Sequence, residues 1–249
     1  MPSIDLNCDV GEGMPSDATL LSLVTSANVA CGFHASDPAT IRSTVRLAVR
    51  QGVAIGAHPS FPDRAGFGRR HLAATPDEVR DDVTYQIGAV WAFCRAEGAR
   101  LTHVKAHGAL YSAAARDRDL ARAICEAARA VDRELAIVCL ARSPMAALAR
   151  SMGVPCVEEA FADRGYTSAG ALVARSVPGA VIRDPELVAE RASRMVREGC
   201  VTASDGSAVA IEPQTLCIHG DTPGAERIAA AVRRRLEADG VEVRSFAAR

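Results

Sequence analysis

Histidine, carboxylate, amide and lysine side chains gather in six short segments of the chain, each at the end of a short apolar run. The segments span residues 5–12, 28–34, 56–63, 104–111, 158–166 and 218–222. Four of the six histidines follow such runs. Histidine titrates near neutral pH and carboxylates can be tuned by their surroundings, so this set suits proton transfer or metal-assisted hydrolysis. A purely structural role for all four histidines is the alternative.

The same segments contain nitrogen and oxygen ligands of the kind that zinc, manganese or iron accept. The candidate metal ligands are Asp5, Asp9, His34 and His58. No HExxH sequence occurs, so this motif gives the metal no support. A divalent metal therefore remains one hypothesis, and a metal-free base or oxyanion site is the other.

Lys105 lies between His103 and His107 and shares their side of a strand. A lysine in that position is either the counter-ion of a buried carboxylate or an electrophile for an oxyanion or phosphate. Because a nearby ammonium disfavours a second positive charge, we expect His103 or His107 to be neutral and able to act as base or ligand.

The segment 63–70 is rich in glycine and arginine. Arg69 and Arg70 could bind a carboxylate or phosphate through two parallel hydrogen bonds, and a solvated basic loop is the alternative. The sequence has neither GxxxxGK[ST] nor a GxGxxG after a strand, so it carries no P-loop and no dinucleotide fingerprint. If the chain takes part in an ATP-driven reaction, the nucleotide is bound in another way or on a different polypeptide.

Short apolar runs alternate with longer amphipathic runs, which is typical of repeated βα units and a parallel sheet. The predicted strands span 3–8, 26–31, 53–58, 101–106, 135–140, 155–160 and 214–219. The predicted helices span 16–24, 38–51, 75–98, 117–132, 143–152, 184–199 and 222–239. Residues 161–183 and 203–213 are expected to form loops or a hairpin, and 242–245 a short edge strand.

Several of these strands alternate between apolar and polar residues. In residues 4–10, the even positions are apolar and positions 5, 7 and 9 are polar. Strands covered by helices on both faces would be continuously apolar instead. One strand face must therefore pack on helices while the other lines a polar lumen. This favours seven or eight βα units closed into a barrel over an open doubly wound sheet.

Composition restricts the class of protein further. The chain has 249 residues, 49% of them hydrophobic, and a formal net charge of −1, which suits one α/β domain over residues 1–249. A balanced charge gives no indication of nucleic-acid binding, and no membrane span or signal peptide is evident. The eight cysteines form no CxxC pair, which favours free thiols in the reducing cytoplasm.

Taken together, the segments at the strand ends resemble the LamB/YcsF family. The matching stretches are DLNCDVGE (5–12), ANVACGFHASDP (27–38), IGAHPSFPDRAGFGRR (55–70), VKAHGALY (104–111), EEAFADRGY (158–166), ALVARSVPGAVI (171–182) and CIHGDTP (217–223). They occur in order and span nearly the whole chain. The few departures, such as Ser36 and Ala106 where the family usually has glycine and proline, remove no ionisable residue from a strand end.

The resemblance implies a distorted (β/α)7-type barrel similar to polysaccharide deacetylase-like barrels. It also implies cleavage of 5-oxo-L-proline, a cyclic amide (lactam), to L-glutamate with ATP hydrolysis, as the A component of a 5-oxoprolinase. Two partners, the B and C components, are then needed, and ATP is consumed by the complex. A lactam is a resonance-stabilised amide, which explains the coupling to ATP: phosphorylation of the ring carbonyl oxygen makes a species that water can attack.

On this basis the two partners activate the substrate and this chain opens the ring. The expected catalytic residues are Asp9, Glu12, His34, His58, Lys105 and His107. The expected substrate-binding residues are Asn7, Asn28, Arg69, Arg70, Asp163, Arg164, Tyr166 and His219. His107 or His58 is expected as general base, with Lys105 and Arg69 or Arg70 neutralising the substrate's anionic groups. A stand-alone metal-dependent deacetylase or amidohydrolase, and a non-catalytic structural component of the complex, are the alternatives.

Overall fold

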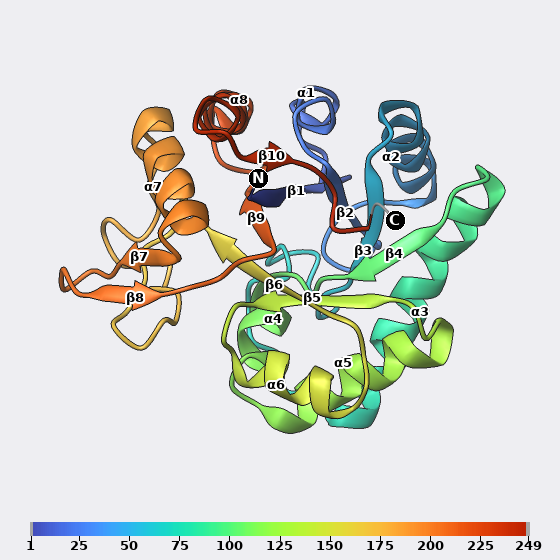
Figure 1. The fold of residues 1–249 in the computed structure, drawn as a ribbon. Coiled ribbons are helices and arrows are strands. Elements are labelled where there is room, and N and C mark those ends of the chain that lie inside the picture. The colour runs from blue at the N-terminus through green and yellow to red at the C-terminus, as the bar shows by residue number, and fades with distance from the viewer. Residues whose placement is uncertain (1, 248–249) are drawn as a thin grey trace.

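Seven parallel strands form a closed barrel in the computed structural model, which describes residues 2–247. The strands are β1 (Ser3–Val10), β2 (Ser26–Ala30), β3 (Ala54–His58), β4 (Leu101–Val104), β5 (Ala136–Leu140), β6 (Cys156–Phe161) and β9 (Thr215–Ile218). They pair in that order, and β9 pairs with both β6 and β1, which closes the ring (Figure 1). The predicted barrel is confirmed, and the open-sheet alternative is wrong.

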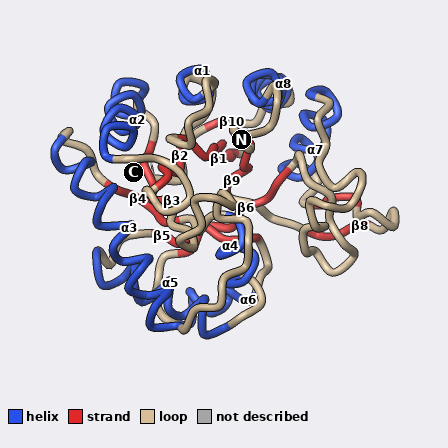
Figure 2. The backbone as a smooth tube through the Cα atoms, turned by 180° about the vertical axis from the view of Figure 1, so that it is seen from behind, coloured by secondary structure: helices blue, strands red, loops and turns tan. Residues whose placement is uncertain are grey.

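Helices surround the barrel (Figure 2). They are α1 (Asp17–Leu21), α2 (Pro38–Gln51), α3 (Pro76–Ala96), α4 (Gly108–Ala114), α5 (Arg118–Val131), α6 (Pro144–Ser151), α7 (Pro185–Arg197) and α8 (Ala225–Ala238). Local sequence sets their starts. The Asp37 side chain accepts the backbone N–H of Thr40 at the start of α2, and Thr75 forms a reciprocal capping box with Glu78 at the start of α3.

The two faces of β1 show why the barrel has a polar interior. Leu6, Cys8 and Val10 are buried in the hydrophobic core with the helices. Asn7 and Asp9 point the other way and form hydrogen bonds with residues of other barrel strands. This is the alternation that the sequence predicts for a strand between a helical layer and a polar lumen.

Three helices depart from the sequence prediction. The predicted helix 16–24 is reduced to the five residues of α1. The predicted helix 222–239 begins only at Ala225, because Gly224 at the N-cap has φ 79° and the two residues before it form a turn. The short helix α4, directly after His107, was not predicted at all.

The predicted hairpin and the predicted edge strand are both present. Strands β7 (Cys200–Thr202) and β8 (Ala208–Ala210) pair antiparallel around a turn in which Gly206 has φ 86°. Strand β10 (Glu242–Val243) pairs in parallel with the start of β1. The hairpin lies beside α7, outside the barrel (Figure 1).

The segment 244–247 follows β10, and its Phe246 lies at the end of the barrel at which the strands begin. Phe246 packs on Ala136, Val138 and Val157, three buried residues from β5 and β6 that form a small cluster separate from the main core. The Phe246 ring also contacts the ring of His103, with centroids 5.2 Å apart. Phe246 thereby covers part of this end of the lumen with apolar contacts, and the cavity lies at the other end.

No helix among residues 2–247 is long and apolar enough to cross a membrane. All eight cysteines are unpaired thiols, and six of them are buried as small core residues.

Candidate active site

The deepest polar layer of the lumen is a hydrogen-bond network that joins the strands. The Asn7 amide donates to Glu159 (2.8 Å) and to Thr215 (2.7 Å), while its carbonyl oxygen accepts from the amide of Asn28 (2.8 Å). The carbonyl oxygen of Asn28 lies 2.9 Å from Nε2 of His103. Asn7 and Asn28 were predicted to bind substrate, yet the structure places them beneath the cavity, where they hold other side chains.

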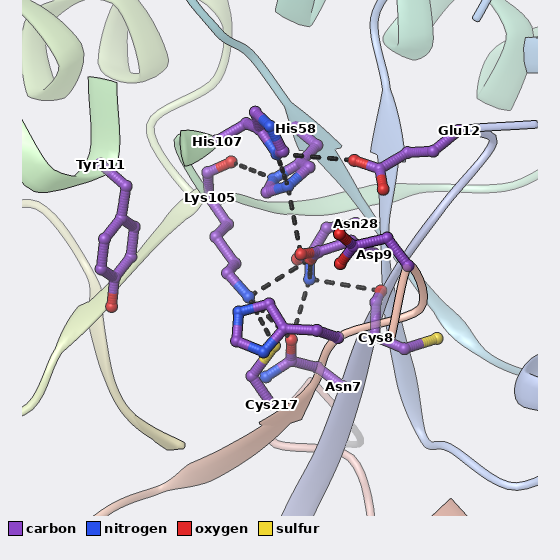
Figure 3. Close-up of polar contacts among 12 residues, drawn as sticks. Asn7, Cys8, Asp9, Glu12, Asn28, His58, Lys105, His107, Tyr111 and Cys217 are labelled. Atoms are coloured by element: carbon purple, nitrogen blue, oxygen red, sulfur yellow. Dashed lines mark hydrogen bonds and ion pairs between the residues drawn. The ribbon is translucent and has the colours of Figure 1, made fainter. Parts of the chain in front are cut away.

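Lys105 lies directly above this layer (Figure 3). Its Nζ is 2.8 Å from Glu159, 3.3 Å from Asp9 and 3.0 Å from the Sγ of Cys217. Burial alone would lower the pKa of Lys105, but the charges of Asp9, Cys217 and Glu159 raise it well above its usual value. Lys105 is therefore a fixed ammonium ion paired with buried carboxylates, as the first of the two predicted roles requires.

His58 and His107 form a pair whose outer nitrogens are both fixed by the backbone. Nδ1 of His58 lies 2.6 Å from the carbonyl oxygen of Lys105, and Nε2 of His107 lies 2.8 Å from that of Phe67. A carbonyl oxygen only accepts, so both of these ring nitrogens carry protons. The inner nitrogens, Nε2 of His58 and Nδ1 of His107, are 3.0 Å apart and share one further proton.

The shared proton belongs to His58. Burial would lower the pKa of His58, but Asp9, whose Oδ2 lies 3.4 Å from its Nε2, raises it. Burial together with the charge of His58 lowers the pKa of His107 to about 2. His58 is thus an imidazolium that donates to a neutral His107. Burial also lowers the pKa of His103 to about 3. The sequence predicted that His103 or His107 is neutral, and both have pKa values far below 7.

The glycine- and arginine-rich loop 63–70 positions His107. Phe67 has φ 54°, a left-handed backbone conformation that is rare for a bulky residue, and its carbonyl oxygen accepts from His107. The next residue, Gly68, has no room for a side chain, because a Cβ there would lie 2.8 Å from the His107 ring. The loop therefore has a structural role that its arginines did not suggest.

His34 and Glu12 complete the cluster. The His34 ring stacks on His107 with centroids 3.9 Å apart. Its Nδ1 lies 3.0 Å from Oγ of Ser60, which itself donates to a backbone carbonyl, so Nδ1 of His34 carries the proton. Its Nε2 faces Oε1 of Glu12 at 2.9 Å. Burial, and next the charge of Asp9, raises the pKa of Glu12 to about 8, so a protonated Glu12 donates to His34.

These four residues fit a divalent metal ion. Ligand atoms of Glu12, His34, His58 and His107 lie within 4.8 Å of one another. Each histidine has its other ring N–H fixed by a carbonyl or hydroxyl oxygen, which is the arrangement that orients histidine ligands in metal sites. Three imidazoles and a carboxylate suit zinc, manganese or iron.

The structure thus places two of the predicted metal ligands, His34 and His58, in the cluster, and adds Glu12 and His107. Asp9 lies beside the cluster, in contact with His58 and Lys105. Asp5 lies elsewhere, because its carboxylate accepts from the hydroxyls of Thr25 and Ser26 and of Thr215. A second group of possible ligands comprises Asp9, Cys217 and His219, and two of them, Asp9 and Cys217, already contact the Lys105 ammonium.

A cavity of about 410 Å³ opens above these residues at the carboxyl ends of the strands. Its lining includes the predicted residues Asp9, Glu12, His58, Arg69, Lys105, His107, Arg164 and His219. Arg69 forms an ion pair with Asp221 there. His219 is held by Asp163, whose Oδ2 lies 2.7 Å from its Nδ1. The carboxyl ends of barrel strands are where α/β barrels place their active sites.

Besides Asn7 and Asn28, and Asp163 which contacts the cavity residue His219, two further predicted substrate-binding residues lie away from the cavity. Arg70 forms an ion pair with Asp63 within its own loop. Tyr166 is fully buried, and its hydroxyl accepts the backbone N–H of Phe161. Neither residue lines the cavity in the described part of the chain.

Other residues of the site were not predicted. Glu159 is fully buried against Lys105, and Tyr111 donates to its carboxylate at 3.1 Å. Cys217 contacts Lys105, and Asp221 holds Arg69. All four lie within the stretches that carry the family resemblance, so the signal was present, but the sequence did not indicate which of their side chains point inward.

Comparison with known proteins identifies the family of this chain. The family model described as the LamB/YcsF family matches residues 4–249. A curated 5-oxoprolinase A component of Pseudomonas syringae pv. tomato is 50% identical over 99% of this chain and 98% of its own length. The crystal structure of a lactam utilization protein from Thermus thermophilus is 52% identical, with a TM-score of 0.93 over 98% of this chain and all of that one.

A more distant likeness concerns the fold alone. A family 4 carbohydrate esterase from Streptomyces lividans has a TM-score of 0.50 at 10% identity, over 97% of this chain and 91% of that one. The full-length family match and the identities of about 50% are decisive. This chain belongs to the LamB/YcsF family.

Proposed function

We propose that this chain acts as the A component of an ATP-dependent 5-oxoprolinase and carries out the opening of the activated lactam ring. The single observation that carries the proposal is the polar cavity, in which an imidazolium–imidazole pair and a buried ammonium lie at the strand ends of a chain 50% identical to a 5-oxoprolinase A component. The partners we propose are the B and C components, which bind ATP and phosphorylate the lactam oxygen, since this chain has no P-loop.

The chemistry balances with two water molecules. Transfer of the γ-phosphoryl group of ATP to the lactam oxygen gives ADP and an imidate-like phosphate. Addition of water to the ring carbon and cleavage of the C–N bond then give an acyl phosphate and a free amine. A second water hydrolyses the acyl phosphate to L-glutamate and phosphate. The ring nitrogen needs a proton as it leaves, and the attacking water must lose one.

The hydrogen bonds favour different histidines for these two proton transfers. The proton between His58 and His107 is the nearest one to the leaving ring nitrogen, because both residues line the cavity and the backbone fixes their outer nitrogens. Asp163 fixes the Nδ1–H of His219, so its Nε2 carries the lone pair that can accept a proton from water. We expected His107 or His58 as the base, and this arrangement favours a donor role for that pair.

Charged groups hold the substrate in place for these steps. Lys105 and Arg69 supply positive charge at the cavity floor and rim for the substrate's carboxylate or phosphorylated oxygen. If a divalent cation were bound by Glu12, His34, His58 and His107, it would replace the proton shared by His58 and His107 and would supply a Lewis acid at the same place. We also propose that residues 1–249 act as one domain in the cytoplasm, where eight unpaired thiols persist.

The test is ATP-dependent formation of glutamate from 5-oxoproline by the reconstituted three-component complex. We expect His107→Ala, Lys105→Ala, Asp9→Asn and His219→Gln to lower turnover at least about a hundredfold, the usual size of a lost acid, base or electrostatic group. Each variant must still assemble with its partners and show the circular dichroism spectrum of the parent. Parental turnover in all four would leave this chain a structural member of the complex.

The metal-capable cluster favours one competing function, a stand-alone metal-dependent amidohydrolase or deacetylase. That function predicts cleavage of a cyclic or N-acetyl amide by the purified chain with zinc, manganese or iron, and no need for ATP or partners. Metal analysis of the purified chain, with amide hydrolysis measured in the absence of partners, separates the two functions.

A further inference from the structure

We propose that Arg116 and Arg175, supported by Arg164, form an anion-binding subsite at the mouth of the barrel that takes the phosphoryl group of the activated substrate. The identity of that substrate rests on the proposed function, but the subsite itself follows from the charges that line the cavity.

Positive charge exceeds negative charge in this cavity. Five cationic side chains line it, namely Arg69, Lys105, Arg116, Arg164 and Arg175. Two of them are compensated, because Lys105 is enclosed by Asp9 and Glu159, and Arg69 is paired with Asp221. Three guanidinium groups are left on the same cavity without an ion pair to a carboxylate of the described chain.

Arg164 is the buried member of the three. Its guanidinium donates to the backbone carbonyl oxygens of Val173 (2.6 Å) and Ala180 (3.3 Å), and it forms no ion pair with the described side chains. Burial, followed by the charge of Arg175, lowers the pKa of Arg164. Two guanidinium groups that repel one another beside a cavity are stabilised when an anion binds between or above them.

Arg116 and Arg175 reach the cavity from different elements. Arg116 follows α4 and is exposed, whereas Arg175 is half-buried in the segment 171–182 that follows β6. Within residues 2–247 neither side chain forms a hydrogen bond or an ion pair that would hold its guanidinium in place. Both donor forks are therefore available to a ligand in the cavity.

The number of uncompensated charges favours a phosphoryl dianion over a carboxylate. A single carboxylate would neutralise one of three guanidinium groups, while a phosphoryl group offers two negative charges and three acceptor oxygens that planar guanidinium groups bind in pairs. Arg69, which lies over the Phe67 ring beside His107, is already paired with Asp221, so a substrate carboxylate would have to share that guanidinium group.

The experiment is calorimetric titration of the full chain with inorganic phosphate at low ionic strength. We expect Arg175→Gln and Arg116→Gln each to weaken phosphate binding by about tenfold or more, the usual effect of losing a charge-assisted hydrogen bond. The matched control is Arg133→Gln, an exposed arginine in the turn before β5 that does not line the cavity; it should bind phosphate as the parent does. Unchanged melting temperatures establish that all three variants fold.

Competition identifies the chemical source of the anion. A phosphoryl subsite predicts that millimolar acetate does not displace phosphate, whereas displacement by acetate at equal concentration would show a carboxylate site and overturn the assignment. Phosphate binding that is absent from the parent, or equal in all variants, would also overturn it. Because this measurement needs neither partners nor turnover, failure of the complex to hydrolyse 5-oxoproline would remove the proposed function and leave the subsite intact.

Discussion

Lys105 is a cation enclosed by the barrel, so its substitution affects stability as well as chemistry. Lys105→Met would leave the buried carboxylates of Asp9 and Glu159 without their counter-ion. We expect a loss of about 3–5 kcal/mol in the free energy of unfolding, which is typical when one partner of a buried ion pair is removed. Urea denaturation followed by circular dichroism measures it.

The matched control is Arg100→Met, which breaks the exposed ion pair with Glu134. That pair should contribute no more than about 1 kcal/mol. Adding Glu159→Gln to Lys105→Met should restore part of the lost stability, because it removes one of the unpaired charges. Equal losses for Lys105→Met and Arg100→Met would contradict the enclosed ion pair.

A second prediction at this scale concerns metal binding and pH. Histidine ligands must be neutral and Glu12 ionised before they bind a metal. His34 and His107 have pKa values of about 3 and 2, so they are neutral throughout, whereas Glu12 has a pKa of about 8 and the pKa of His58 is raised. Zinc affinity should therefore rise by about tenfold or more per pH unit between pH 6 and 8.

Equilibrium dialysis of the chain against buffered zinc at pH 6, 7 and 8 measures this dependence. Glu12→Gln should weaken the affinity and flatten its rise with pH, because a glutamine has no proton to release. Exposed His71, which lies outside the cluster, provides the control variant His71→Ala. An affinity that does not change with pH would show that Glu12 and His58 are not ligands.

At the scale of elements, two glycines on neighbouring elements should respond in opposite ways to the same substitution. In β3, a Cβ on Gly56 would lie 2.2 Å from the ring of His103, which is held by Thr102 and Asn28. Gly56→Ala should destabilise the protein by about 3 kcal/mol or prevent folding. In α3, Gly88 has nothing within 4 Å of the added Cβ, so Gly88→Ala should stabilise by about 1 kcal/mol.

Thermal unfolding of both variants tests this pair. If Gly56→Ala unfolded at the same temperature as the parent, the His103 ring would be able to leave the lumen. The hydrogen bonds that link Asn7, Asn28 and His103 would then not be needed to hold the strands in place.

Strand alternation was sufficient to predict the barrel. A strand covered by helices on both faces would be apolar throughout, so the polar residues Asn7 and Asp9 indicate that one face of β1 lines a polar lumen. It was not sufficient for β6, where Glu158 and Glu159 are adjacent. Glu158 faces outward and forms an ion pair with Arg150, while Glu159 faces Lys105. Either glutamate could have faced the lumen, because only the packing on each face of the strand determines which alternate residues point inward.

The loop 63–70 and the helix α4 show another limit of the sequence. Arg70 looked like a ligand for an anion, but its pairing with Asp63 depends on a loop conformation that Phe67 adopts with φ 54°. The seven residues of α4 are too few for a periodic pattern to be recognised. In both places the tertiary contacts of His107 decide the local structure.

At the scale of the whole molecule, β10 pairs with the start of β1, and Phe246 after it packs on one end of the barrel. Phe246→Ala would remove the half-buried ring that packs on Ala136, Val138 and Val157. We expect a loss of about 1–3 kcal/mol in the free energy of unfolding, less than for a fully buried phenylalanine. Chemical denaturation measures it.

Turnover of the reconstituted complex with Phe246→Ala, measured well below its melting temperature, should match that of the parent. The proposed catalytic groups line the cavity at the opposite end of the lumen, so we expect the ring to contribute to stability alone. A large loss of turnover in the folded variant would show instead that the contact between Phe246 and His103 affects the position of Lys105.

The closure by Phe246 has a consequence for the order of events during catalysis. Because Phe246 covers part of the other end of the lumen, the proposed reaction would take in the phosphorylated lactam and both waters, and release glutamate and phosphate, through the same cavity mouth. We then expect both products to leave before the next substrate binds. A partner protein bound across that mouth would limit the turnover rate by the rate at which it dissociates. Either product added in excess should inhibit turnover, because it would occupy the one cavity mouth that the described chain leaves for the substrate.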